Sequence, residues 1–208
     1  MTPRAPLIAA VASLALLCGC SSAPATRYYV LSPTAQMPAH RAQALVDREA
    51  AAVAVVIKDV RLPQYLDRSQ IVTRGSDHRL QIAEYEQWAG NLREDMTRVL
   101  AENLGRLLES DRVVAAPHNL RLQPDYRVEV EVLRFEREPG GRVGLSARWW
   151  LTRGSDASLL ASPAETLFGA PLGEGASFEA MVTSMSAVYG ELAQAIARGI
   201  RARSAGGS

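Results

Sequence analysis

The chain contains two cysteines, Cys18 and Cys20, separated by a single glycine near the N-terminus. A thiol can close a disulfide, bind a metal ion or accept a lipid through a thioether bond. A disulfide or a metal pair between Cys18 and Cys20 is one interpretation, but the sequence has no other cysteine and no clustered histidines to complete a site. The chemistry of these thiols therefore has to be judged from the residues that precede them.

Residues 1–17 have the composition of a secretory signal peptide. Arg4 is the one charged residue in this segment, and residues 7–17 (LIAAVASLALL) are an uninterrupted apolar run. A membrane-spanning helix needs about 20 apolar residues, so the run is too short for a transmembrane anchor. The segment Leu17-Cys18-Gly19-Cys20 resembles the lipobox of bacterial lipoproteins. This resemblance predicts cleavage after residue 19 and acylation of Cys20.

This cleavage divides the chain into four parts. They are a signal peptide (1–19), an acylated cysteine with a short linker (20–27), one globular domain (28–203) and a disordered tail (204–208). The linker reaches at most about 25 Å, which keeps the domain close to the membrane. Ser21 after the cysteine resembles the pattern that is sorted to the outer membrane. We therefore expect a lipid-anchored protein on the periplasmic face of the outer membrane.

The mature chain lacks the usual catalytic and cofactor patterns. His40, His78 and His118 have no second metal ligand at helical or turn spacing, and no nucleophile elbow, Walker A motif or dinucleotide fingerprint occurs. The formal net charge of +1 falls to zero once Arg4 is removed, so no basic field attracts nucleic acid. The sequence predicts a protein that is not an enzyme, with no metal and no cofactor.

Hydrophobic periodicity predicts an α/β fold. Apolar helical stripes follow the capping residues Asn91 and Ser177. Strand patterns cover 28–31, 51–62, 69–73, 78–85, 126–136, 143–151 and 159–168, and a short strand begins at residue 113. A slip in alternation at Leu133 and Phe135 indicates a β-bulge or a change of cover. We expect a two-layer sandwich, with two amphipathic helices packed on one face of a mostly antiparallel or mixed sheet.

Two polar features of the strands allow more than one interpretation. Glu129 and Glu131 share one strand face, either as a carboxylate pair or, beside Arg127, as a solvated or interface surface. Trp149 and Trp150 point to opposite faces of their strand. Trp149 is expected in the core, whereas Trp150 is either exposed for binding or covered by the other helix.

The segment after Pro63 is the candidate partner-binding site, because proline ends a strand and forces the chain out of the sheet. Five residues form the predicted site, namely Tyr65, Leu66, Asp67, Arg68 and Arg74. Tyrosine and arginine are enriched at the cores of protein interfaces. In the alternative interpretation, Tyr65 and Leu66 plug the sheet edge while Asp67 and Arg68 pair with each other or with the surroundings of Arg74.

Three segments together resemble a known family. They are Tyr28-Tyr29-Val30-Leu31, the stretch LPQYLDRSQIVTRGSDHRLQIAEYEQW (62–88) and the helix NLREDMTRVLAENL (91–104). These motifs are similar to those of the auxiliary lipoproteins of ABC-type transport systems, including the paraquat-inducible lipoprotein C group. Gly90-Asn91 departs from the Glu-Pro that relatives often carry there, which affects only the entry to the helix.

The resemblance implies a non-enzymatic component of an intermembrane lipid transport system. Its partners would be a membrane-anchored MCE-domain protein and an inner-membrane permease, with lipid as possible cargo and a homo-oligomeric ring as a possible assembly. The alternative is a structural envelope lipoprotein that assists assembly of a membrane machine without transporting lipid. A periplasmic solute-binding protein is disfavoured because the chain is too short for two lobes.

The lipobox makes a direct prediction about anchoring. Cys20→Ser removes the thiol that accepts the lipid, so we expect an uncleaved precursor that takes up no palmitate. Radiolabelled palmitate incorporation and the mass of the mature protein measure both effects. Labelling of the Cys20→Ser protein at the wild-type level would refute the assignment, and Cys18→Ser is the matched control.

Overall fold

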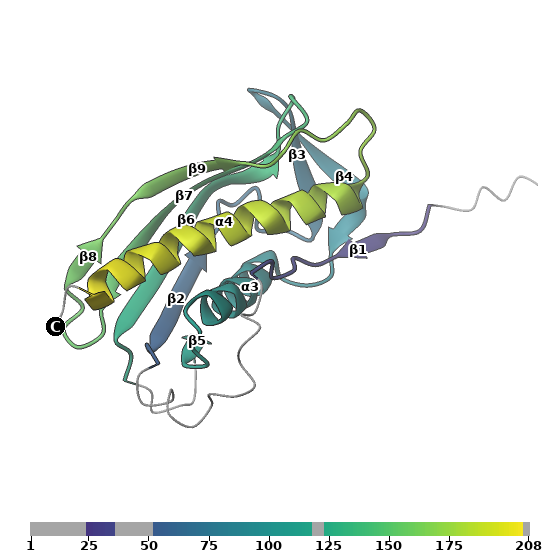
Figure 1. The fold of residues 1–208 in the computed structure, drawn as a ribbon. Helices are drawn as coiled ribbons and strands as arrows, with labels where there is room; N and C mark the ends of the chain where they lie inside the picture. Colours follow the sequence, from purple (N-terminus) through teal and green to yellow (C-terminus); the bar gives the residue numbers. More distant parts are fainter. Residues whose placement is uncertain (1–23, 36–51, 118–122, 206–208) are drawn as a thin grey trace, which may run out of the picture.

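The structure is a computed structural model that describes residues 24–35, 52–117 and 123–205. The predicted signal peptide, Cys20, His40 and His118 lie outside the described residues. The described chain contains two long helices, α3 (Leu92–Leu107) and α4 (Phe178–Ala205). Both pack on the same face of one sheet, and among the described residues no helix covers the other face (Figure 1). The predicted fold class is confirmed.

The sheet of the described residues has nine strands and is mixed. They are β1 (Arg27–Tyr29), β2 (Val55–Arg61), β3 (Gln70–Ser76), β4 (Arg79–Trp88), β5 (Val113–Ala115), β6 (Tyr126–Arg137), β7 (Val143–Arg153), β8 (Leu159–Ala161) and β9 (Ala164–Phe168). The order along one path is β1-β4-β3-β6-β2-β5, and β7 pairs with β6, β8 and β9. Pairing is parallel for β1–β4, β2–β5, β2–β6 and β3–β6, and antiparallel elsewhere.

Both helices begin where the capping residues predict. The Asn91 side chain accepts a hydrogen bond from the Glu94 amide at 3.2 Å, and Ser177 Oγ accepts one from the Ala180 amide at 3.1 Å. The α3 stripe is buried at Leu92, Met96, Val99, Leu100 and Leu104, and the α4 stripe at Met181, Val182, Met185, Tyr189, Leu192 and Ile196. Helix α4 continues through Ser204 and Ala205, which the sequence assigned to the tail.

The slip in alternation along β6 is a β-bulge. The register between β6 and β7 shifts between Val132 and Arg134. The extra residue, Leu133, is 48% exposed, whereas Phe135 is 1% exposed and returns to the core face. The bulge therefore keeps Phe135 in the core and turns Glu136, the next residue, to the face away from the helices.

Three local expectations change in the structure. The single strand expected over 159–168 is two short strands, β8 and β9, because Ser162 and Pro163 interrupt it and proline cannot donate to a sheet ladder. The strand expected to begin at His78 begins at Arg79, because Asp77 and His78 form the turn before it. Trp150 lies on the helix-free face, half-buried, with the Arg61 guanidinium 5.4 Å from its ring centroid, so no helix covers it.

The packing of α3 predicts a clear stability effect. Leu104 is fully buried under the sheet, so Leu104→Ala should lower the free energy of unfolding by about 2–5 kcal/mol. Gln194→Ala on the exposed side of α4 is the control and should change stability little. Chemical denaturation of the soluble domain measures both, and equal stabilities would show that the stripe does not support the core.

Candidate functional site: the anchor strap and the β2–β3 loop

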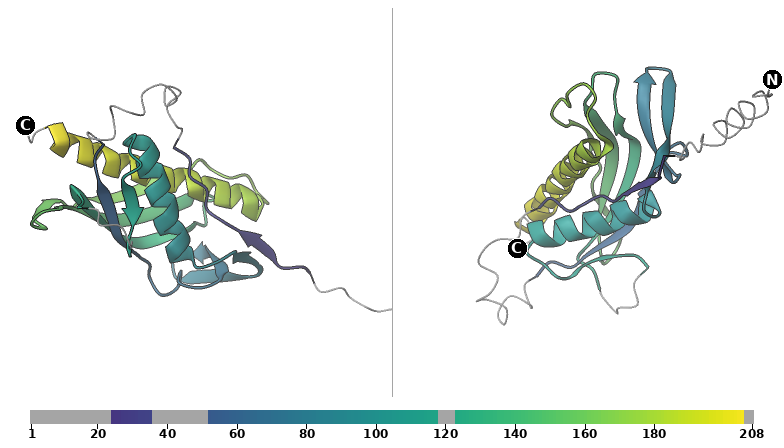
Figure 2. Two further views of the ribbon diagram at one scale, coloured as in Figure 1. Left: turned by 90° about the horizontal axis from the view of Figure 1, so that it is seen from below. Right: turned by 90° about the vertical axis from the view of Figure 1, so that its right-hand side faces the viewer.

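The chain that follows the predicted lipid anchor is fastened along its length. We call residues 27–35 the anchor strap. Its first part, β1, pairs in parallel with β4, with Arg27 opposite Glu86 and Tyr29 opposite Trp88. The strap then leaves the sheet and passes across the two helices, as Figure 2 shows.

A carboxylate holds the start of the strap. Glu86 is 5% exposed, and it accepts hydrogen bonds from Arg27 Nε at 2.9 Å and from the Tyr29 hydroxyl at 2.6 Å. The Arg27 hydrogen bond is the main cause that lowers the pKa of Glu86, and Tyr29 adds to it, whereas burial acts in the opposite direction. The Glu86 carboxylate is therefore stabilised in its charged form by the strap itself.

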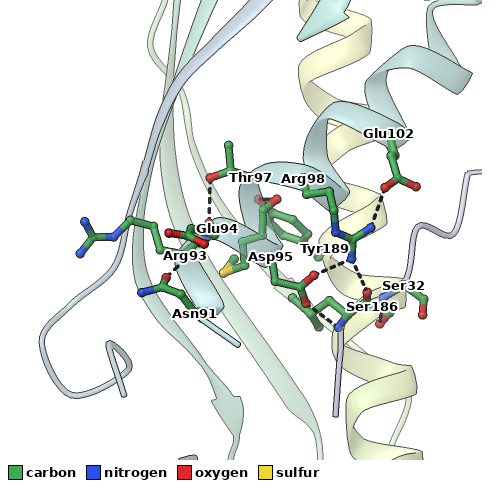
Figure 3. A network of polar contacts seen from close by, with 12 residues as sticks. Ser32, Asn91, Arg93, Glu94, Asp95, Thr97, Arg98, Glu102, Ser186 and Tyr189 are labelled. Atoms are coloured by element: carbon green, nitrogen blue, oxygen red, sulfur yellow. Dashed lines mark hydrogen bonds and ion pairs between the residues drawn. The ribbon is translucent and has the colours of Figure 1, made fainter. Parts of the chain in front are cut away.

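Helix α3 holds the middle of the strap with side chains. Asp95 Oδ2 accepts a hydrogen bond from the Leu31 amide at 2.8 Å, and Arg98 Nη2 donates to the Leu31 carbonyl at 3.3 Å. Arg98 also pairs with Asp95, which fixes the two side chains together. From α4, Ser186 Oγ accepts a hydrogen bond from the Ser32 amide at 3.1 Å (Figure 3).

A buried asparagine holds the end of the strap. Asn103 is fully buried, and its Oδ1 accepts hydrogen bonds from the Thr34 amide at 3.0 Å and the Ala35 amide at 2.9 Å. Arg106 Nη1 donates to the Ala35 carbonyl at 3.1 Å. These residues lie on the same face of α3 as Asp95. Their side chains bind the backbone amides and carbonyls of the strap, as a neighbouring strand would in a sheet.

The sequence pattern predicted a strand at 28–31 but not the side chains of α3 and α4 that hold the strap. The useful signal was Asn103, a polar residue set within the apolar stripe of α3, and the charged pair one turn apart in the first half of that helix. A polar residue at a core position is a reason to look for a specific hydrogen-bond partner.

The predicted partner-binding site divides into buried and exposed residues. Tyr65 donates its hydroxyl to Glu136 Oε2 at 2.8 Å, and Arg74 Nε donates to Glu136 Oε1 at 2.8 Å. Glu136 is 1% exposed, and the Phe135 amide also donates to it, at 2.9 Å. Burial, followed by the Glu136 carboxylate, raises the pKa of Tyr65. Arg74 thus neutralises a buried carboxylate, and Tyr65 adds a hydrogen bond to it.

The other three residues of that site lie in the same loop. Leu66 is 3% exposed and belongs to the core, as the plug interpretation has it. Asp67 pairs with Arg93 of α3 at 2.6 Å, and not with Arg68. Arg68 is exposed. The exposed residues of the predicted site are therefore Asp67 and Arg68, and partner binding there stays a prediction.

The carboxylates of β6 favour the interpretation as a solvated face. Glu129 pairs with Lys58 at 2.6 Å and with Arg61 at 3.8 Å on the helix-free face.

The described residues contain no group of three or more histidine, cysteine, aspartate or glutamate residues that could hold a metal ion. None of the helices in the described segments is both long and apolar enough to span a membrane.

The described residues define an α/β fold in which the strap is fastened to the sheet and to both helices. The chain belongs to the family of ABC-type transport auxiliary lipoprotein components, whose sequence profile matches residues 29–197. The match begins within the strap and includes the β2–β3 loop. The family resemblance inferred from the motifs is confirmed.

Two solved structures are similar over nearly their whole length. A crystal structure described as an uncharacterized protein is 22% identical, with a TM-score of 0.67, and the match covers 85% of this chain and 99% of the other. Protein XCC0632 from Xanthomonas campestris is 18% identical, with a TM-score of 0.60, and the match covers 85% and 98%. At these identities the likeness shows the fold. None of the curated proteins matches the sequence.

The strap contacts predict a local effect on exchange. Asp95→Ala removes the acceptor of the Leu31 amide, so hydrogen exchange at Leu31 should become about tenfold faster or more. Glu94→Ala is the matched control, because it removes the neighbouring acid of the same helix turn. Peptide-resolved exchange by mass spectrometry measures both, and equal rates over the strap would contradict the capture by α3.

Proposed function

We propose that this protein is a non-enzymatic lipoprotein of the outer membrane, anchored through Cys20 and facing the periplasm. It docks the periplasmic MCE assembly of an ABC-type intermembrane lipid transport system to that membrane. The observation that carries the proposal is membership of the auxiliary lipoprotein family over residues 29–197. The inner-membrane permease completes the system, and lipid is the cargo.

The strap supports this role because it holds the start of the described chain, next to the predicted anchor, at one end of the domain. Tyr29 packs against Phe178 at the start of α4, with 6.4 Å between ring centroids. At the other end of α4, the Tyr126 hydroxyl lies 3.2 Å from Ser204 Oγ. A helix of 28 residues is about 42 Å long. In our proposal the strap end faces the membrane, and the opposite end extends into the periplasm.

The β2–β3 loop lies at the anchor end, because the Trp88 amide next to the strap donates to the Ser69 carbonyl at 2.7 Å. Within our proposal, Asp67 and Arg68 form a contact there with the partner or with a second copy in a homo-oligomeric ring. Tyr65, Leu66 and Arg74 hold the loop in shape from beneath. A contact on a loop fixed by buried groups is preorganised, which lowers the entropy lost on binding.

Co-purification tests the function directly. The acylated full-length protein, extracted from membranes in mild detergent, should bring down an MCE-domain protein and a permease, identified by mass spectrometry. Lipid extraction of the complex should recover bound lipid, and density fractionation should place the protein in the outer membrane. Capture of envelope-assembly proteins without any transporter component would instead favour the structural lipoprotein.

The loop contact has its own test. Arg68→Glu reverses a charge at the exposed position of the loop and should weaken capture of the partner or self-assembly while circular dichroism stays unchanged. Arg79→Glu, at the exposed tip of the β3–β4 hairpin, is the matched control. A folded Arg68→Glu protein that still binds and assembles normally would remove the loop from the interface.

A further inference from the structure

A second polar site lies at the end of the domain farthest from the strap. A cavity of about 1100 Å³ opens between the start of β6, the end of β7 and the last turn of α4. Four arginines line it, namely Arg112, Arg127, Arg153 and Arg203. Asp125 is the one carboxylate among the lining residues, which leaves them with an excess of three positive charges. We call these residues the basic pole.

Backbone contacts hold two of these arginines in place. Arg127 Nη1 donates to the carbonyls of Arg153, at 3.2 Å, and Gly154. Arg112 Nη1 donates to the Ala52 carbonyl at 3.0 Å. A guanidinium carries five N–H donors, so each fixed arginine keeps donors for a further acceptor. The positive charges are therefore positioned before any ligand arrives.

Two carboxylates, Asp125 and Asp156, lie at or beside the basic pole. Asp125 Oδ2 accepts a hydrogen bond from the Ala54 amide at 2.7 Å. Asp156 approaches Arg153 Nε only to 3.9 Å, and both side chains are more than half exposed. The carbonyl end of α4 adds a partial negative charge, which is smaller than one full charge. The excess of arginine over carboxylate persists, although the chain as a whole carries a formal net charge of only +1.

We propose that the basic pole binds an acidic peptide segment, rich in aspartate and glutamate, of the periplasmic transport partner. Arginine pairs with carboxylates through two parallel hydrogen bonds, and several guanidinium groups around one cavity suit several carboxylates on one chain. The cavity is too large for a single phosphate ion. The start of α4, which packs against the strap, lies about 42 Å from the helix end that lines the basic pole. The choice of partner rests on the proposed function.

A peptide probe tests the chemistry of the site. The acylated full-length protein in detergent micelles is titrated with a fluorescent peptide that carries six Asp and Glu residues separated by Gly and Ser. Arg153→Glu combined with Arg203→Glu should weaken binding by about tenfold or more, because exposed charges at the cavity are reversed without touching the fixed arginines. Binding should also weaken as salt is raised.

The matched control is Arg79→Glu combined with Arg148→Glu, which makes the same charge change at exposed positions away from the cavity. If both double variants bind the peptide equally weakly, the loss comes from the overall charge of the protein, and the proposal is overturned. Competition by inorganic phosphate, or binding of phosphatidylglycerol vesicles, without binding of the peptide would also overturn it, since the ligand would then be a phosphate group.

Co-purification separates this proposal from the proposed function. If the wild type and the Arg153→Glu, Arg203→Glu variant capture the transporter equally well, the basic pole does not bind the partner. The proposed function then still holds. If the wild type captures no transporter component although the peptide binds specifically, the proposed function fails and the acidic-peptide site remains with another partner. Loss of capture in the variant alone supports both.

Discussion

The fold depends on how the backbone of the anchor strap is satisfied. Beyond β1 the strap has left the sheet, so its buried amides and carbonyls need other partners. Asp95, Arg98 and Asn103 of α3 provide them across more than sixty residues of sequence. The arrangement is costly, because Asn103 Nδ2 is buried without a hydrogen-bond partner among the described residues. In return, the start of the described chain has a defined position on the domain.

The strap keeps its position only if β4 is itself held to the main sheet, and the contact that holds it is small. β3 meets β6 at a single register pair, Thr73 with Arg137. Beside it, Arg74 of β3 pairs with Glu136 of β6 at 2.7 Å, and both side chains are largely buried. The bulge at Leu133 brings Glu136 to the face where Tyr65 and Arg74 can reach it. A buried carboxylate with two partners thus fastens the β3–β4 hairpin, and with it the strap.

The sequence predicted the fold well where local periodicity carries the information. The caps Asn91 and Ser177, the two apolar stripes, the β6 bulge and the family all follow from residues close together in the chain. The site was predicted only in part. The sequence pointed to Tyr65 and Arg74 but not to Glu136, their common partner, because contacts between distant side chains leave no periodic signal. The capture of the strap by α3 was missed for the same reason, whereas the β8–β9 break has a local cause, Pro163, that the single-strand prediction overlooked.

Two glycines in α4 show how closely the strap and the sheet constrain this helix. Glycine within a helix is less favourable than alanine by about 1 kcal/mol. A Cβ at Gly190 would nevertheless collide with Thr34 Oγ1 of the strap. A Cβ at Gly199 would lie 2.7 Å from Trp149 Cη2 in the core. α4 therefore has a glycine where the strap crosses it, at Gly190, and another where it packs against β7, at Gly199. The same helix therefore contacts the strap along its first half and lines the basic pole with its last turn.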